Sequence, residues 1–341
     1  MWRARASLVG IAGTAAGSAA YLSHRRWACA EQTGHRAAIS SQSALHHEQQ
    51  VVVITGCTSG LGRALAGEFR RLGHTVIGCG RRMERLSEMQ RQFGPPHQFH
   101  FCDVKEEQSV CAFASHVGAC DIVIANAGTV SEANVPPWEA DADEFRDIVQ
   151  TNLLGVYHVT RHFGPKLKQQ AETSGHHGGP PKRLVNISSG AGHTSNPWQS
   201  ACEHAQERLK LRINGNPSYH SARIQRSKRI RVLLFARSDS ASKWGVESLS
   251  MSTSQAIRAC GLESRFVCVS LAPGSVESEM NRDPGAHALE RWAPVAAQRI
   301  LSLRPEDSGS AIALAEFYDE AYVGSWVIPS GARAPPFDGW G

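Results

Sequence analysis

The chain has 341 residues, of which 41% are hydrophobic and 20% are charged, and it carries a formal net charge of +5 at neutral pH. A chain of this length and apolar content can bury a core of its own, and one large domain with extra segments is the simplest expectation. The nine cysteines are scattered without a C-x-x-C pair, so no disulfide framework and no metal centre are expected. Buried thiols in a reducing compartment are predicted instead.

The first 48 residues differ in composition from the rest of the chain. Four arginines flank an uncharged stretch over residues 6–22, and the first acid is Glu31. A basic, acid-poor start is typical of a targeting segment, and we expect a transit peptide for an organelle, a mitochondrion or a plastid. The stretch is too short and too weakly apolar to predict a firm membrane span. The alternatives are a signal or weak membrane anchor, or a disordered tail on a cytoplasmic or membrane-associated protein.

From Gln50 onward, short Val- and Ile-rich runs alternate with helical periodicity, which indicates a parallel sheet covered by helices on both faces. A strand is predicted over residues 51–55 and a helix over 60–72, where apolar residues recur at spacings of three and four. Further strands are predicted over residues 75–79, 99–102, 122–125, 184–188, 266–271 and 326–328.

The predicted fold class is α/β, a Rossmann-like doubly wound parallel sheet in a single domain. The predicted parts are an extension over 1–48, the domain over 49–201 and 239–330, a basic insert over 202–238 and a tail over 331–341.

A glycine-rich turn joins the first strand to the first helix. Its sequence is Thr55-Gly56-Cys57-Thr58-Ser59-Gly60-Leu61-Gly62. Glycines there let the backbone approach a pyrophosphate, and the free N–H groups and dipole of the helix favour negative charge. The turn therefore predicts a dinucleotide site, with its contacts from Gly56, Ser59, Gly60, Leu61 and Gly62.

The spacing T-G-x-x-x-G-x-G resembles the short-chain dehydrogenase/reductase family, and further matches follow in the family's order over about residues 51–329. They are Asp103 in Cys-Asp-Val, the run Asn126-Ala127-Gly128, Asn152 in Thr-Asn-Leu-Leu-Gly, Ser189 in Asn-Ile-Ser-Ser-Gly, Lys243 in Ser-Lys-Trp-Gly, and the run Pro273-Gly274-Ser275-Val276-Glu277-Ser278. The resemblance implies a nicotinamide-dependent oxidoreductase of a small carbonyl or alcohol substrate. It also implies a homodimer or homotetramer.

The resemblance assigns a role to each match. Asp103 would hold the adenine, and Asn126, Ala127 and Gly128 would line the cofactor. Pro273, Gly274, Val276 and Ser278 would lie beside the nicotinamide. The implied catalytic residues are Asn152, which helps a water relay, Ser189, which orients the substrate oxygen, and Lys243. Lys243 would also grip the cofactor ribose and lower the pKa of a tyrosine phenol that exchanges a proton with the substrate.

The residues after the second strand favour NADP(H) as the cofactor. An acid there would bind the adenosine ribose hydroxyls, whereas a basic residue accommodates a 2′-phosphate. The sequence reads Gly80-Arg81-Arg82 and has no acid before Glu84. Arg81 is therefore the predicted phosphate ligand, and NAD(H) is the alternative cofactor.

The tyrosine that the resemblance demands is missing. Asp239 stands four residues before Lys243, and an aspartate is ionised at neutral pH and would pair with the lysine rather than donate a proton. The spacing also departs from the family, in which about thirteen residues separate the serine from the tyrosine. Here residues 202–238 form a surplus of 37 residues with nine Lys or Arg and two acids.

Codon arithmetic suggests how the surplus arose. An intron that opens with GT can begin inside a TGT codon for Cys202, and one that closes with AG can end inside TCA-GAY codons for Ser238 and Asp239. Joining the leftover T and AY gives TAY, a tyrosine codon, and keeps the frame. We infer that residues 202–238 translate a retained intron in a eukaryotic gene. Tyr219, in Tyr-His-Ser-Ala-Arg, is a weaker candidate because its spacing is wrong and Arg replaces Lys.

Two further functions compete with an impaired NADP(H)-dependent oxidoreductase. If Asp239 and the insert are genuine, the chain is a catalytically inactive dinucleotide-binding sensor or scaffold. RNA binding through the basic insert is disfavoured because no aromatic-interleaved motif accompanies the charge, so no nucleic-acid partner is expected. The substrate is not identified. Met280, Trp292, His193 and Trp198 suggest only a moderately apolar pocket.

Overall fold

The structure, a computed structural model, describes residues 48–131, 139–173, 179–189, 237–281, 286–314 and 317, with the side chains of 237–240 left out. Several predictions from the sequence lie outside these residues. They concern the extension before residue 48, the insert up to residue 236 with Tyr219, the side chain of Asp239, the strand at 326–328, the tail at 331–341, and the pocket residues His193 and Trp198.

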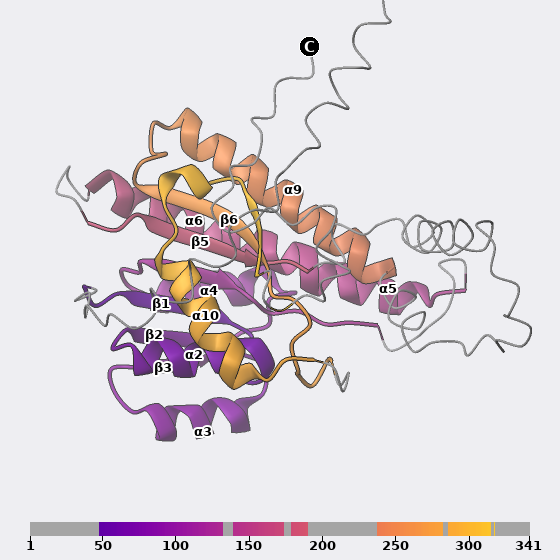
Figure 1. The fold of residues 1–341 in the computed structure, drawn as a ribbon. Helices are drawn as coiled ribbons and strands as arrows, with labels where there is room; N and C mark the ends of the chain where they lie inside the picture. The colour runs from indigo at the N-terminus through magenta and orange to yellow at the C-terminus, as the bar shows by residue number, and fades with distance from the viewer. Residues whose placement is uncertain are drawn as a thin grey trace, which may run out of the picture. The chain divides into compact units, whose positions relative to one another are not determined.

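Seven parallel strands form one sheet in the order β3-β2-β1-β4-β5-β6-β7. Figure 1 labels β3, β2 and β1 on one side of this sheet and β5 and β6 on the other. The strands are β1 (Val51–Thr55), β2 (Thr75–Gly80), β3 (Gln98–Phe101), β4 (Ile122–Ala125), β5 (Lys182–Ile187), β6 (Phe266–Ala272) and β7 (Ala311–Ala313). The first six lie within two residues of the predicted strands, and β7 was not predicted. The strand order reverses between β1 and β4, and in such sheets ligands bind at this point, beyond the carboxyl ends of the strands. The predicted doubly wound α/β fold is confirmed.

Helices cover both faces of the sheet. They are α2 (Gly60–Arg71), α3 (Met83–Phe93), α4 (Glu107–His116), α5 (Ala142–Val149), the π-helical turn η2 (Gln150–Leu154), α6 (Gly155–Thr173), α9 (Arg237–Ala259), α10 (Leu289–Leu301) and the 3₁₀ turn η4 (Pro305–Asp307). Among the described residues, no helix is both long enough and apolar enough to cross a membrane.

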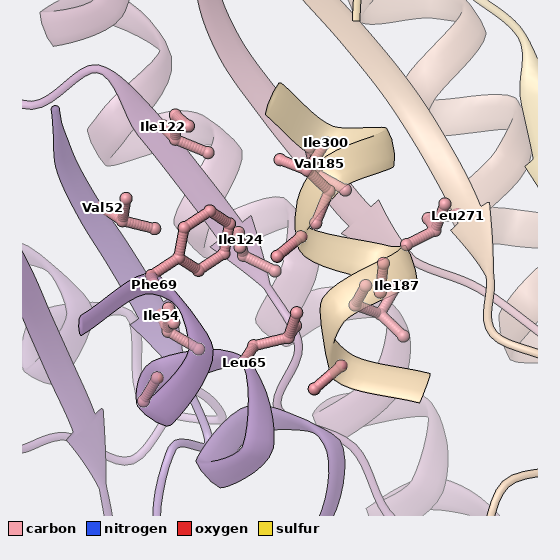
Figure 2. Close-up of a cluster of buried hydrophobic side chains, with 14 of the residues drawn as sticks. Val52, Ile54, Leu65, Phe69, Ile122, Ile124, Val185, Ile187, Leu271 and Ile300 are labelled. Atoms are coloured by element: carbon pink, nitrogen blue, oxygen red, sulfur yellow. The ribbon is translucent and has the colours of Figure 1, made fainter. Parts of the chain in front are cut away.

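The alternation of side chains along the strands builds two cores. Val52 and Ile54 of β1 point to the face covered by α2, α3 and α10 and belong to the same buried cluster as Phe69 and Ile300 (Figure 2). Val53, between them, points to the other face, which α4, α6 and α9 cover. A strand buried on both faces reads as a continuous Val/Ile run, which is why the sequence pattern located these strands.

Candidate active site

The glycine-rich turn after β1 packs tightly against the turn after β4. Gly56 adopts a left-handed φ of +67°, and a Cβ at this position would lie 2.8 Å from the Cα of Ala127. A Cβ at Gly62 would lie 2.4 Å from the carbonyl oxygen of Gly56. Ser59 is the N-cap of α2 but makes no side-chain cap, and the first turn of the helix has no acid. The backbone N–H groups at this helix start therefore suit an anion.

Asn126 ties the ends of β4 and β1 together. Its Nδ2 donates to the carbonyl oxygens of Thr55 at 2.8 Å and Gly56 at 3.2 Å. The backbone N–H groups of Asn126 and Ala127 both donate to the Thr55 hydroxyl, each at 3.1 Å. The amide of Asn126 is thus used to hold the phosphate-binding turn in place.

Asn152 lies in the π-helical turn η2, a widened helical turn of the kind often found at functional sites. It is buried, its Oδ1 accepts from the Thr129 N–H at 2.8 Å, and its Nδ2 donates to the Thr129 carbonyl at 2.9 Å and to the Ser242 hydroxyl at 3.3 Å. The side chain therefore connects the loop after β4 to α9.

Lys243 lies on α9 and reaches the end of β5, where its Nζ donates to the carbonyl oxygen of Ile187 at 2.9 Å. A Cβ on Gly128 would lie 3.2 Å from the Asn152 Oδ1 and 3.9 Å from the Lys243 Nζ. The loop after β4, Asn152 and Lys243 are thus gathered at one point beyond the strand ends. Position 239 lies one turn before Lys243 in α9, so both positions share a face of the helix.

The two serines after β5 differ in environment. Ser188 is buried, and its hydroxyl donates to the Glu247 carboxylate on α9 at 2.9 Å. Ser189, the predicted catalytic serine, follows it and is half-buried. The hydroxyl of Ser188 is thus used to dock α9 on the sheet, and the catalytic role of Ser189 stays a prediction.

The predicted nicotinamide-side loop follows β6. Gly274 has a φ of +87°, and a Cβ there would lie 2.4 Å from the Phe317 carbonyl oxygen. Val276 is buried, and the Ser278 hydroxyl accepts from the backbone N–H groups of Met280 at 3.2 Å and Asn281 at 3.0 Å. Ser278 also lies over the phosphate-binding turn, since a Cβ on Gly60 would be 3.4 Å from its Cβ.

The prediction that Trp292 lines the substrate pocket is wrong. Trp292 lies on α10 and is fully buried in the core, and its indole N–H donates to the Pro273 carbonyl at 3.0 Å. This hydrogen bond holds the loop after β6 against α10, and the side chain is too buried to line a pocket. Met280 is half exposed on that loop.

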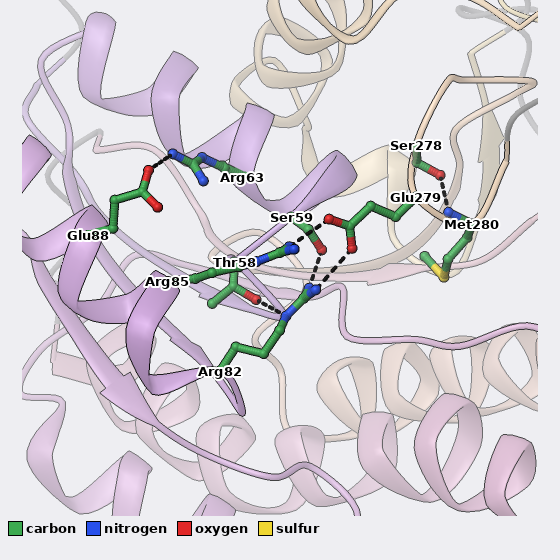
Figure 3. Close-up of polar contacts among 9 residues, drawn as sticks. All are labelled: Thr58, Ser59, Arg63, Arg82, Arg85, Glu88, Ser278, Glu279 and Met280. Carbon is green, nitrogen blue, oxygen red and sulfur yellow. Dashed lines mark hydrogen bonds and ion pairs between the residues drawn. The ribbon is translucent and has the colours of Figure 1, made fainter.

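The arginines after β2 have different partners. The Arg81 guanidinium lies 3.8 Å from the Asp103 carboxylate, so the predicted phosphate ligand and the predicted adenine-binding acid are neighbours. Arg82 instead contacts the phosphate-binding turn, donating to the hydroxyls of Thr58 at 3.3 Å and Ser59 (Figure 3). Sequence reasoning passed over Arg82 because two adjacent arginines look alike in a sequence, although their side chains point in different directions.

Five of the seven cysteines that the structure describes are buried, as the sequence led us to expect. Burial raises the pKa of the Cys57 thiol, in the phosphate-binding turn, to about 12. Burial also raises the pKa of Cys268 in β6 to about 12. These thiols stay protonated at neutral pH and are therefore poor nucleophiles.

Comparisons with known proteins identify the family. Residues 50–202 match the family model of the short chain dehydrogenases. The NADPH-dependent pterin aldehyde reductase of Arabidopsis thaliana is 31% identical over 275 residues, which cover 77% of this chain and 92% of that protein. The serine 3-dehydrogenase of Agrobacterium fabrum is 31% identical over 146 residues, which cover 42% of this chain and 54% of that protein.

Solved structures agree on the fold. The carbonyl reductase Sniffer of D. melanogaster matches with a TM-score of 0.60 and 18% identity, covering 78% of this chain and 97% of that one. An NADPH-bound carbonyl reductase from chicken fatty liver matches with a TM-score of 0.58 and 20% identity, covering 78% and 96%. Because the likeness to the Arabidopsis reductase runs over nearly the whole of that protein, the chain belongs to the short-chain dehydrogenase/reductase family of oxidoreductases, as its motifs predicted.

Proposed function

We propose that this chain is an NADP(H)-binding oxidoreductase of carbonyl or alcohol substrates whose turnover is impaired because Asp239 stands where a proton-donating tyrosine is needed. The observation that carries the proposal is the gathering of Lys243, Asn152 and the end of β5 beside the phosphate-binding turn. An NADPH-dependent aldehyde reductase among the relatives supports the reaction class and the cofactor.

The residues fit a dinucleotide. A Cβ at Gly56 would collide with Ala127, and one at Gly62 would collide with the Gly56 carbonyl oxygen. Glycine at both positions therefore permits the close packing that presents the helix start to a pyrophosphate. The exposed guanidinium groups of Arg81 and Arg82 supply positive charge where a 2′-phosphate would lie. When bound, the nicotinamide supplies or accepts the hydride.

The rest of the chemistry is proton transfer, and it depends on position 239. A tyrosine one helical turn before Lys243 would have its phenol pKa lowered from about 10 by the lysine cation, so that it could exchange a proton with the substrate oxygen near neutral pH. An aspartate at this position is ionised, and the same cation favours its charged form. It therefore cannot serve as the neutral acid that carbonyl reduction requires, although Asn152 and Lys243 remain in place.

We also propose that residues 202–238 are a translated intron and that the tyrosine is lost at its boundary. The match to the family model ends at residue 202, where the surplus stretch begins, and this end point supports the proposal. The alternative is a catalytically inactive dinucleotide-binding sensor or scaffold, in which Asp239 and the insert are functional. Sequencing the mature transcript across residues 201–240 distinguishes the two, since only the first expects a spliced product that encodes tyrosine.

The activity test compares three proteins: the original chain, a chain without residues 202–238, and that shortened chain with Asp239→Tyr. NADPH oxidation is followed with a panel of aldehydes and ketones. We expect turnover only in the third protein, with a gain of about 10²- to 10⁴-fold, which is the usual contribution of a positioned general acid. If the original chain turns over as fast as the shortened Asp239→Tyr chain, a tyrosine at position 239 is not required for the reaction. NADPH binding without turnover in all three would favour the sensor.

A further inference from the structure

A carboxylate from the loop after β6 lies on two arginines beside the phosphate-binding turn. Glu279 Oε2 accepts from Arg82 Nη1 at 2.9 Å, and its Oε1 accepts from Arg85 Nη1 at 2.6 Å (Figure 3). Arg82 directly follows the turn after β2, whereas Arg85 lies in α3. The two arginines and Glu279 are almost two hundred positions apart in the sequence, so only the fold brings them together.

The contact spans the strand-order reversal, the point at which this type of fold binds a dinucleotide. On one side, Arg82 also donates to the hydroxyls of Thr58 and Ser59 in the phosphate-binding turn. On the other side, Ser278, the residue before Glu279, lies over Gly60 of the same turn. Glu279 therefore reaches across the strand-order reversal between β1 and β4, from the half of the sheet that carries β6 to the half that carries β2.

We propose that Glu279 is a specificity-determining residue, an internal anion that occupies the Arg82–Arg85 pair until the 2′-phosphate of the cofactor takes its place. This inference rests on the proposed NADP(H) binding. Guanidinium groups bind carboxylates and phosphates through the same forked N–H donors, so both anions compete for them. A cofactor without a 2′-phosphate has no group that replaces Glu279, and the ion pairs then stay intact.

The exposure of the three side chains makes such an exchange feasible. Arg82, Arg85 and Glu279 are 45%, 37% and 49% exposed. Ion pairs this open to solvent are weak and exchange readily, in contrast to buried ones. Hydrogen bonds from both arginines also lower the pKa of the Glu279 carboxyl below its ordinary value, so the internal anion is charged at neutral pH. The local charge balance favours phosphate, because one carboxylate leaves the two arginines with an excess positive charge.

The test is calorimetric titration of the full chain and its Glu279→Gln variant with NADPH and with NADH. We expect the variant to bind NADPH about three- to tenfold more tightly, the scale set by two exposed ion pairs, and to bind NADH with unchanged affinity. Glu88→Gln is the matched control, because the Glu88 carboxylate pairs with Arg63 at 2.7 Å, and Arg85 adds only a smaller Coulombic effect on it. It should change NADPH affinity by less than about twofold.

Salt dependence gives a second readout. NADPH binding to the original chain exchanges one anion for another, whereas binding to Glu279→Gln adds an anion to two unoccupied cations, so the variant's affinity should fall more steeply with salt. Unchanged or weaker NADPH binding by Glu279→Gln overturns the proposal, since a residue that only positions the arginines would weaken binding when removed. If the original chain and the variant both fail to bind NADPH, the proposed function itself is wrong.

Discussion

Substitution by alanine should have opposite effects on the free energy of unfolding at two glycines of α2. Gly62 faces the phosphate-binding turn, where a Cβ would lie 2.4 Å from the Gly56 carbonyl oxygen and 2.5 Å from the Asn126 Nδ2. Gly67, farther along the helix, has nothing within 4 Å of the position of a Cβ. Glycine inside a helix costs about 0.5–1 kcal/mol relative to alanine, so Gly67→Ala should raise the free energy of unfolding by about that amount.

Gly62→Ala gains the same helix propensity but forces the turn apart. Overpacking of this kind costs about 1–3 kcal/mol. The displacement also disturbs the two hydrogen bonds from the Asn126 Nδ2 to Thr55 and Gly56, each worth about 0.5–1.5 kcal/mol. Together these effects outweigh the propensity gain, and we expect Gly62→Ala to lower the free energy of unfolding by about 1–3 kcal/mol. The two alanine variants should therefore differ by about 1.5–4 kcal/mol.

Urea unfolding followed by circular dichroism measures this difference. We expect the midpoint to shift down for Gly62→Ala and up for Gly67→Ala, with equal slopes, because neither change alters the surface exposed on unfolding. Calorimetry with NADPH should show that Gly67→Ala binds like the original chain and that Gly62→Ala does not bind. If both variants have the same midpoint and the same NADPH affinity, the close packing of Gly62 against Asn126 is not required for pyrophosphate binding.

Two further outcomes test the cofactor and the domain boundary. Arg81→Ala and Arg82→Ala should each weaken NADPH binding by about 1.5–3 kcal/mol, the value of a charge-assisted contact, with little effect on NADH. Equal affinities of the original chain for NADPH and NADH would contradict this assignment. A shortened chain that begins at His46 should unfold cooperatively at the urea midpoint of the full chain, because β1 begins at Val51. Aggregation of the shortened chain alone would mean that the N-terminal extension is not a separable targeting segment.

Most of the sheet was predictable because its strands are buried on both faces. Val51–Thr55 and Ile122–Ala125 are continuous β-branched or apolar runs between turn residues, and their predicted bounds match the structure. β7 was missed for the opposite reason. Ala311–Ala313 is three residues long and alanine-rich, a composition without strand preference, and its pairing with β6 determines its conformation.

The site was predictable where the residues belong to short motifs and not where distant segments meet. Glycines, Asn126 and Lys243 could be placed because each follows or faces a strand end. The contact of Glu279 with Arg82 has no local signature. The prediction for Trp292 failed for a different reason. Its spacing with Ala296 and Ile300 on α10 follows the apolar stripe of a helix, and this pattern indicates a core residue rather than a pocket residue.

The contacts of α9 bear on whether the missing tyrosine is a structural or a chemical defect. The helix is tied to β5 by Ser250, whose hydroxyl accepts from the Asn186 Nδ2 at 2.9 Å, and by Glu247, which accepts from Ser188. Lys243 adds a third tie at the end of the same strand. All three ties come from residues after position 239, and none of these three contacts involves the side chain there. We therefore infer that a tyrosine at position 239 would meet an already assembled site, and that a single substitution can restore the proton donor once the insert is removed.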